Sequence, residues 1–107
     1  MTLQDEETPI DQEIVNEVVA VTPETWNCIV LEVEYSCDHG GEGFDHVIYS
    51  SEGHRDFVEP SEELYSLTFR LQQLFRKYGG YWKKAKYEIN VDEDGVDYKV
   101  KFDLGDR

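Results

Sequence analysis

The apolar residues of two segments recur at the spacing of an α-helix. The first segment begins at Thr8-Pro9, a pair that suits an N-cap and a first helical position, and it ends before Pro23. The second begins at the N-cap residue Ser61 and stops at Gly79-Gly80. Its apolar stripe consists of Leu64, Leu67, Leu71, Leu74, Phe75 and Tyr78. We therefore predict two amphipathic helices, with residues 1–7 as a flexible polar lead-in before the first.

The remaining segments alternate between apolar and polar residues, which is the pattern of β-strands with one buried face. A first strand is predicted over residues 26–37 and a second over 44–50, joined by a glycine-rich turn or loop over 38–43. A short third strand is predicted near residues 54–58. The final segment, from Trp82 to Leu104, is predicted to be a hairpin that turns at Asp92-Glu93-Asp94-Gly95.

The order of these elements predicts an α+β fold. The elements follow the order α-β-β-(β)-α-β-β, which gives an antiparallel β-sheet of four to five strands with two helices packed on one face. The chain has 107 residues, enough for one hydrophobic core and too few for two. We expect a single domain over residues 1–107.

Charge is distributed unevenly along the chain, whose net charge is −14. Residues 1–69 contain seventeen acidic residues and one basic residue, Arg55, whereas residues 70–87 contain six basic residues and no acidic one. This segregation produces either a dipolar surface or internal pairing, and the sequence leaves both open. The negative charge argues against direct binding of nucleic acid and of anionic membranes.

The sequence contains no signal-peptide pattern and no apolar run of about 20 residues, so we expect a soluble cytoplasmic protein. Its two cysteines, Cys28 and Cys37, are expected to be buried or half-buried thiols in a reducing compartment. A zinc site is the alternative, and it would have to recruit His46 and His54 from elsewhere. We expect no cofactor and no metal.

The strings that mark common enzyme chemistry are absent from the sequence, including GxSxG, GxGxxG, the P-loop and HExxH. The start of a calcium loop is suggested by Asp92-x-Asp94-Gly95, but the later glutamate is missing and a hairpin turn explains the segment. Histidines and acids gather near the glycine-rich segment, which leaves a small hydrolase as an alternative. These residues are His39, His46, His54, Asp38, Asp45 and Asp56. We nevertheless predict that the protein is not an enzyme.

The polar face of the first two strands, together with its bordering loops, is the candidate binding surface. It is acidic, and complementary charge would speed its encounter with a basic protein. The residues assigned to it are Glu32, Glu34, Asp38, Glu42, Asp45, His46, Glu52 and Asp56. On charge alone, a merely solvated face is the alternative interpretation.

An N-terminal amphipathic helix is followed in this chain by Pro23-Glu24-x-Trp26, Ile29, Leu31, Tyr35, Leu64, Leu67, Leu71, Phe75, Trp82, Gly95 and Phe102-Asp103. This order of elements and residues resembles that of the YezG-like immunity proteins, small bacterial proteins encoded beside polymorphic toxins. The resemblance spans residues 10–104 and departs from the family pattern at residues 37–60.

The resemblance implies an immunity protein that binds and neutralises the toxic C-terminal domain of a cognate polymorphic or contact-dependent toxin, often a nuclease. The acidic composition is compatible with this role, because a nuclease must be basic to hold phosphates. The resemblance supplies no catalytic residue. An acidic mimic of nucleic acid and a general protein-interaction adaptor stay open as alternatives, and so does homo-oligomerisation.

Overall fold

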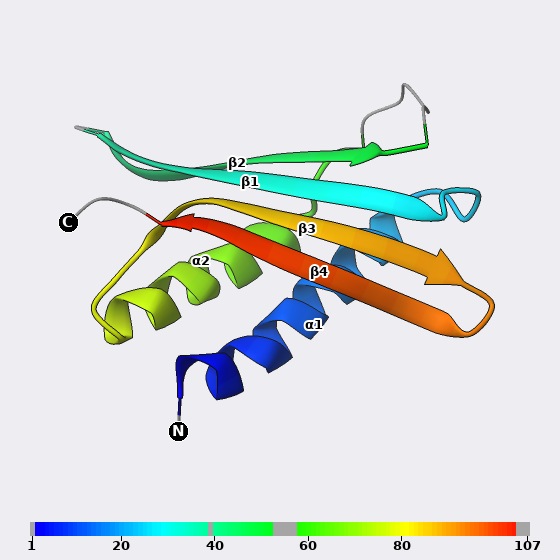
Figure 1. Ribbon diagram of the computed structural model, residues 1–107. Coiled ribbons are helices and arrows are strands. Elements are labelled where there is room, and N and C mark those ends of the chain that lie inside the picture. Colours follow the sequence, from blue (N-terminus) through cyan, green and yellow to red (C-terminus); the bar gives the residue numbers. More distant parts are fainter. Residues whose placement is uncertain (1, 39, 53–57, 105–107) are drawn as a thin grey trace.

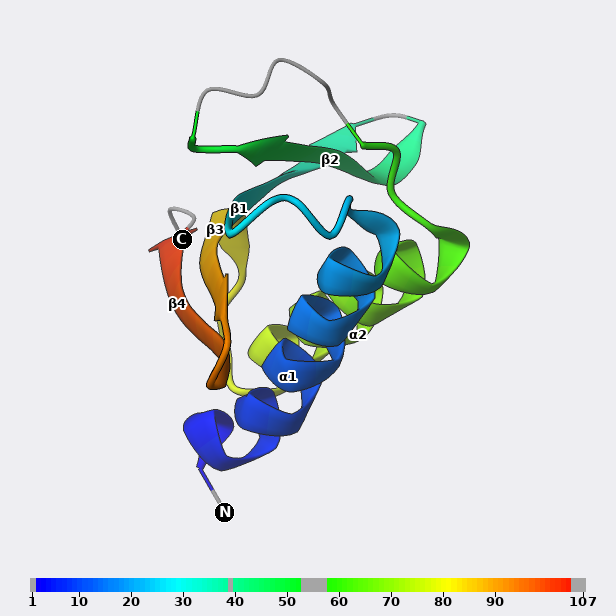
Figure 2. The same ribbon diagram turned by 90° about the vertical axis from the view of Figure 1, so that its right-hand side faces the viewer.

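The computed structural model describes residues 2–38, 40–52 and 58–104. Its elements are α1 (Leu3–Val21), β1 (Cys28–Asp38), β2 (Gly41–Ser50), α2 (Glu62–Lys77), β3 (Trp82–Asp92) and β4 (Gly95–Leu104). The strands form one antiparallel sheet in the order β2-β1-β3-β4. Both helices lie against the same side of this sheet (Figure 1), which curves around them (Figure 2). The predicted α+β fold and its element order are confirmed.

One core fills the space between the sheet and the helices. In β1, every second residue points into it, and Ile29, Leu31 and Val33 are at most 1% exposed. The same alternation in β3 buries Tyr87, while Leu64 of α2 is fully buried from the opposite side. Burying such side chains contributes about 1.5–3 kcal/mol each. Their burial therefore explains why this side of the sheet faces the helices. Most side chains on the opposite side of the sheet face solvent, although Val30 there is only 5% exposed.

The second helix forms as its sequence predicts. Ser61 is the N-cap, and its Oγ accepts a hydrogen bond from the backbone N of Leu64 at 3.2 Å. The same hydroxyl donates to Glu17 in α1 at 2.7 Å, which fixes the start of α2 against α1. At the other end, Gly79 has a φ of +89°, a conformation that favours glycine and ends the helix.

The first helix begins earlier than the sequence analysis predicted. Residues 3–7 are helical, so the prediction of a flexible lead-in there is wrong. Thr2 and Asp5 form a capping box, in which each side chain accepts a hydrogen bond from the other residue's backbone N, at 3.3 and 3.2 Å. Pro9 lies inside the helix and not at its first position. The capping box and the contacts of Glu6 with α2 stabilise the turn that precedes this proline.

The second strand also begins earlier than predicted. The pairing of β1 with β2 continues to Asp38 and Gly41, so only residues 39 and 40 separate the strands and the expected loop over 38–43 is wrong in extent. Gly41 has a φ of +107°, which permits this tight reversal. The predicted third strand falls mostly outside the described residues. Within them, Val58 makes an isolated antiparallel bridge to Ile48.

A buried glutamine connects α2 to the start of β3. Gln72 is fully buried, and its side-chain amide donates to the carbonyl of Trp82 at 2.9 Å and accepts from the backbone N of Trp82 at 3.1 Å. The sheet register shifts between Trp82 and Lys84 at the same point. Gln72 therefore satisfies backbone groups that the irregular end of the sheet leaves unpaired.

Candidate protein-binding face

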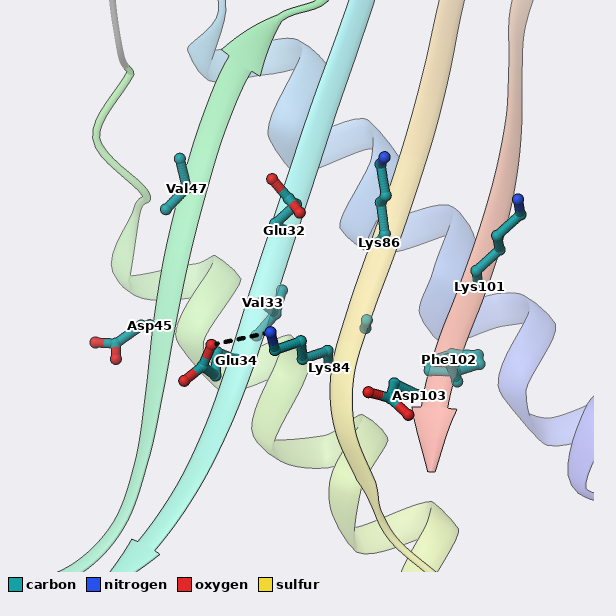
Figure 3. Close-up of a pocket in the computed structure, with 11 residues that line it drawn as sticks. Glu32, Val33, Glu34, Asp45, Val47, Lys84, Lys86, Lys101, Phe102 and Asp103 are labelled. Atoms are coloured by element: carbon teal, nitrogen blue, oxygen red, sulfur yellow. Dashed lines mark ion pairs between the residues drawn. The ribbon is translucent and has the colours of Figure 1, made fainter. Parts of the chain in front are cut away.

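The solvent side of the sheet forms a shallow hollow of about 450 Å³ (Figure 3). We call the charged and apolar side chains that project from this side the outer face. It comprises Glu32, Glu34, Asp45, Val47, Lys84, Lys86, Lys101 and Asp103. The acidic residues Glu32, Glu34 and Asp45 come from β1 and β2, whereas the lysines come from β3 and β4. The outer face therefore has an acidic half beside a half with three lysines, which we call the lysine half although it also contains Asp103, directly opposite Lys84.

Opposite charges meet where the two halves join. In the register of β1 and β3, Glu34 lies directly across from Lys84, and Glu32 directly across from Lys86. The Glu34 carboxylate is 3.7 Å from the Lys84 Nζ, and both side chains are more than half exposed. Exposed ion pairs of this kind contribute at most about 1 kcal/mol, so the junction is only weakly stabilised by them.

Like charges meet on either side of this junction. Glu34 of β1 is directly opposite Asp45 of β2, and Lys86 of β3 is directly opposite Lys101 of β4. Like charges directly opposite in an antiparallel ladder destabilise the pairing. These two pairs oppose folding slightly, although Glu34 also lies 3.7 Å from Lys84 and Lys86 lies 3.7 Å from Glu88. A binding partner with complementary charges would relieve both pairs further.

The helix layer neutralises much of the basic segment that the sequence contains. Among the described residues, ion pairs join α2 to other elements: Arg70 with Glu13 at 3.3 Å, Lys77 with Glu6 at 2.9 Å, and Arg76 with Glu42. With the Glu34–Lys84 pair, they favour internal pairing over a purely dipolar surface. Only part of the basic segment, in β3, reaches the outer face.

Several residues assigned to the binding surface lie away from the outer face. Glu42 sits at the hairpin end of β2, where its carboxylate contacts Arg76 and accepts a hydrogen bond from the Tyr35 hydroxyl at 2.9 Å. Glu52 accepts from the backbone N of Asn27 and of Cys28, at 2.8 and 3.0 Å, and so fastens the start of β1. Asp38 is the last residue of β1, and Asp56 lies outside the described residues.

His46 points into the protein, and its assignment to the wet face is wrong. It shares the inner side of β2 with buried Ile48, so strand alternation turns it toward α2. Its Nε2 is 3.0 Å from the hydroxyl of Thr68, and its ring packs against Tyr65 with the centroids 4.3 Å apart. Burial lowers the pKa of His46 to about 4, against smaller opposing effects of Phe44 and Asp45. The ring is therefore neutral at pH 7.

The alternative sites receive no geometric support from the described part of the chain. Cys28 is half-buried, with its Sγ 3.3 Å from Asn90, but Cys37 is exposed and not buried as expected. No group of three or more potential metal ligands comes together among the described residues. Of the three histidines considered for hydrolysis, His46 alone lies within the described ranges. In those ranges, neither helix has the length and apolar character needed to cross a bilayer.

The lysine half of the outer face was missed by the sequence analysis. Alternation placed Lys84, Lys86 and Lys101 on polar strand faces, but only the strand order places β3 beside β1. The candidate site is thus a surface of the sheet that carries both signs of charge, which suits recognition of another protein's charged surface. No protein-family model and no curated protein matches this chain.

Proposed function

We propose that this protein is an immunity protein: it binds the toxic C-terminal domain of a cognate bacterial toxin and neutralises it. The outer face is the surface through which it binds. The resemblance to YezG-like immunity proteins motivates the choice of partner, and the geometry of the outer face motivates the choice of surface.

One observation carries the proposal, namely the like-charge pairs that flank the junction of the two halves. Glu34 faces Asp45 on one side, and Lys86 faces Lys101 on the other. Selection for stability alone would favour opposite charges at such positions. Unfavourable local arrangements such as these like-charge pairs are expected at functional sites, where a bound partner can supply the opposite charges.

The charges of the outer face fit a toxin domain of the nuclease type. Such a domain carries basic residues that hold phosphates, and these would meet the acidic half. Where it uses a divalent cation, it also carries carboxylates that bind the metal, and these would meet Lys86 and Lys101. A single-signed mimic of nucleic acid would have no use for the lysine half, so the two-signed surface favours a dedicated protein partner over the mimic.

The first test is direct binding to the toxin domain encoded by the adjacent gene. Isothermal titration calorimetry with the purified domain should give a one-to-one complex of nanomolar affinity, and the complex should lack toxic activity. Unrelated nucleases serve as the control, because a cognate inhibitor should leave them active. Inhibition of many unrelated nucleases would instead support the mimic, and absence of any binding would refute the proposed function.

The second test identifies the surface. Charge reversal of Glu32 or Glu34 to lysine should slow association with the toxin domain by about tenfold at low salt, measured by stopped flow. Glu93→Lys, in the turn between β3 and β4, changes the net charge equally and provides the matched control. Equal slowing by all three substitutions would mean that only net charge matters and that the outer face is not the binding surface.

A further inference from the structure

β2 is an edge strand, and its register shows which of its backbone groups face outward. The sheet order places β1 on one side of β2, with no described strand on the other. The backbone N of Ser51 donates to Cys28, and that of Val58 donates to Ile48 at 3.3 Å. In an antiparallel ladder, alternate residues bond to the same side. The N–H and C=O groups of Glu42, Phe44 and His46 therefore point, like those of Ile48, toward the free edge.

The chain itself begins to cover this edge and then stops. Val58 pairs with Ile48 in antiparallel orientation, so continuing the register would place Pro60 opposite His46. Proline has no N–H to donate, and it cannot extend a ladder. The chain then turns away at Ser61 into α2. Among the described residues, none pairs with the edge from Glu42 to His46.

An exposed aromatic hollow lies beside this open edge. It is formed where β2 approaches α2 and is lined by Glu42, Phe44, Tyr65, Ser66, Phe69 and Arg70. Tyr65 and Phe69 project from α2 with 43% and 45% of their surface exposed, and the Phe69 ring packs edge-on against Phe44. Exposed aromatic side chains of this kind are frequent anchors in protein interfaces.

Charge decides which occupant suits the edge. The residue that projects to the outer face between these edge positions is Asp45, and it adjoins Glu34. A cation on an added strand would lie diagonally or directly across from Asp45 and relieve the like-charge pair. A second copy of this chain would bring another net charge of −14, and such copies repel one another. A basic strand from a different protein is therefore the favoured occupant.

We propose that the partner of the outer face inserts an extended strand along the edge of β2 from Glu42 to His46. Alternate side chains of that strand are apolar and enter the aromatic hollow, and the intervening side chains are basic and lie beside Asp45. Backbone pairing provides affinity, and the hollow and Asp45 select the sequence. This mode of binding rests on the proposed function for the identity of the partner.

A matched pair of substitutions at Glu42 tests the backbone contact. Glu42→Ala and Glu42→Pro both remove the carboxylate that contacts Arg76, but only proline removes the N–H that faces the free edge. The ladder to β1 does not use that N–H, so both variants should fold, which urea unfolding verifies. Glu42→Pro should bind the adjacent toxin domain about tenfold more weakly than Glu42→Ala. Equal affinities of the two folded variants would contradict strand insertion.

Hydrogen exchange provides a second readout that does not depend on substitution. In the wild-type complex, the backbone amides of Phe44 and His46 should exchange at least tenfold more slowly than in the free protein. The amide of Tyr98 in β4, at the opposite edge of the sheet, should change little and is the control. Unchanged exchange at Phe44 and His46 in a formed complex would refute insertion of a partner strand and leave the proposed function intact.

A synthetic peptide separates the two proposals if the toxin domain does not bind. The peptide Lys-Val-Lys-Val-Lys-Val-Lys has the required alternation, and Glu-Val-Glu-Val-Glu-Val-Glu is its control. Selective protection of the Phe44 and His46 amides by the lysine peptide would support the edge as a strand-binding site, even without the proposed partner. No protection by either peptide, or protection in the free protein that grows with its own concentration, would overturn the proposal.

Discussion

The charged residues of this protein are arranged differently in its helix layer and on its outer face. In the helix layer, acids of α1 meet bases of α2, as in the pairs Glu13–Arg70 and Glu6–Lys77. On the outer face, an acid faces an acid in Glu34–Asp45, and a lysine faces a lysine in Lys86–Lys101.

This difference separates charged residues whose arrangement stabilises the fold from charged residues whose arrangement does not. Pairing in the helix layer neutralises side chains that the two helices bring together in the native state. The like-charge pairs of the outer face have no such effect, since each opposes the ladder that contains it, although Glu34 also pairs with Lys84 and Lys86 with Glu88. The helix layer and core are the part of the molecule that secures the fold, and the outer face is the part that we propose binds a partner.

The largest expected effect lies on the inner side, at the buried side chain of Gln72. Gln72→Leu removes both hydrogen bonds to the backbone of Trp82 and leaves that buried N–H and C=O unpaired. We expect a loss of about 3 kcal/mol in the free energy of unfolding, measured by urea denaturation. Gln73→Leu, at the exposed neighbouring position, is the control and should change stability by less than about 0.5 kcal/mol. Similar values for both variants would contradict the role of Gln72.

A buried carboxyl group provides the next effect. Asp11 is 3% exposed and accepts a hydrogen bond from the Tyr87 hydroxyl at 2.5 Å. Burial, reinforced by Glu7 one turn earlier, raises the pKa of Asp11 to about 8. The folded state thus holds this proton more tightly than the unfolded state, whose aspartates have a pKa of about 3.9. The stability from protonated Asp11 is complete below about pH 4 and is lost as the pH rises toward 8.

Asp11→Asn removes this pH dependence, because an amide has no proton to lose. Relative to wild type, the variant should become more stable as the pH rises from 4 toward 8, with little difference near pH 4. Urea denaturation at both pH values measures this. Asp97→Asn, at an exposed position in β4, is the control. A difference between Asp11→Asn and wild type that does not vary with pH would refute the assignment.

A smaller effect of opposite sign is expected on the outer face. Lys101→Glu places an acid across from Lys86 and turns a repulsive pair into an attractive one. We expect an increase of about 0.5 kcal/mol in the free energy of unfolding, which should shrink in high salt. Lys99→Glu is the matched control, since Lys99 already faces Glu88 and its reversal should destabilise the protein. A gain for both variants would reflect an effect of overall charge and not of the pair.

The smallest effect concerns the ion pairs of the helix layer. Arg70→Gln breaks the ion pair with Glu13, and both side chains of this pair are more than half exposed. We expect a loss of no more than about 0.5 kcal/mol, because solvent screens such pairs. A double-mutant cycle with Glu13→Gln isolates the interaction. A coupling above about 1 kcal/mol would show that the helix layer depends on this pair more than its exposure suggests.

The sequence predicts much of the fold because local signals agree with the tertiary structure. Ser61, the leucine stripe and Gly79-Gly80 define α2, and clean alternation defines β1, β3 and β4. The prediction fails at the start of α1, where two helix-start signals compete. Pro9 favours a first helical position at that residue, but the helix begins earlier, at the capping box of Thr2. The glycines at residues 41 and 43 suggested a loop, although both can occupy a strand next to a tight turn.

The candidate site could be predicted only in part. Alternation places Glu32 and Glu34 together, and it could have shown that His46 points inward, because His46 and buried Ile48 lie on the same side of β2. The lysine half could not be found this way. Its position depends on the pairing of β1 with β3, which are far apart in the sequence, and no local pattern specifies which strands become neighbours.

The most direct test of the central claim is one variant, Asp45→Lys, measured for both stability and binding. It pairs a lysine with Glu34 in the free protein and presents the wrong charge to a basic partner. The account predicts that its free energy of unfolding rises by about 0.5 kcal/mol, while its association with the toxin domain of the adjacent gene slows by about tenfold relative to Glu93→Lys. The central claim is that the like-charge pairs of the outer face lower stability and serve to bind a partner. A variant that is no more stable than wild type, or that associates as fast as Glu93→Lys, would contradict it.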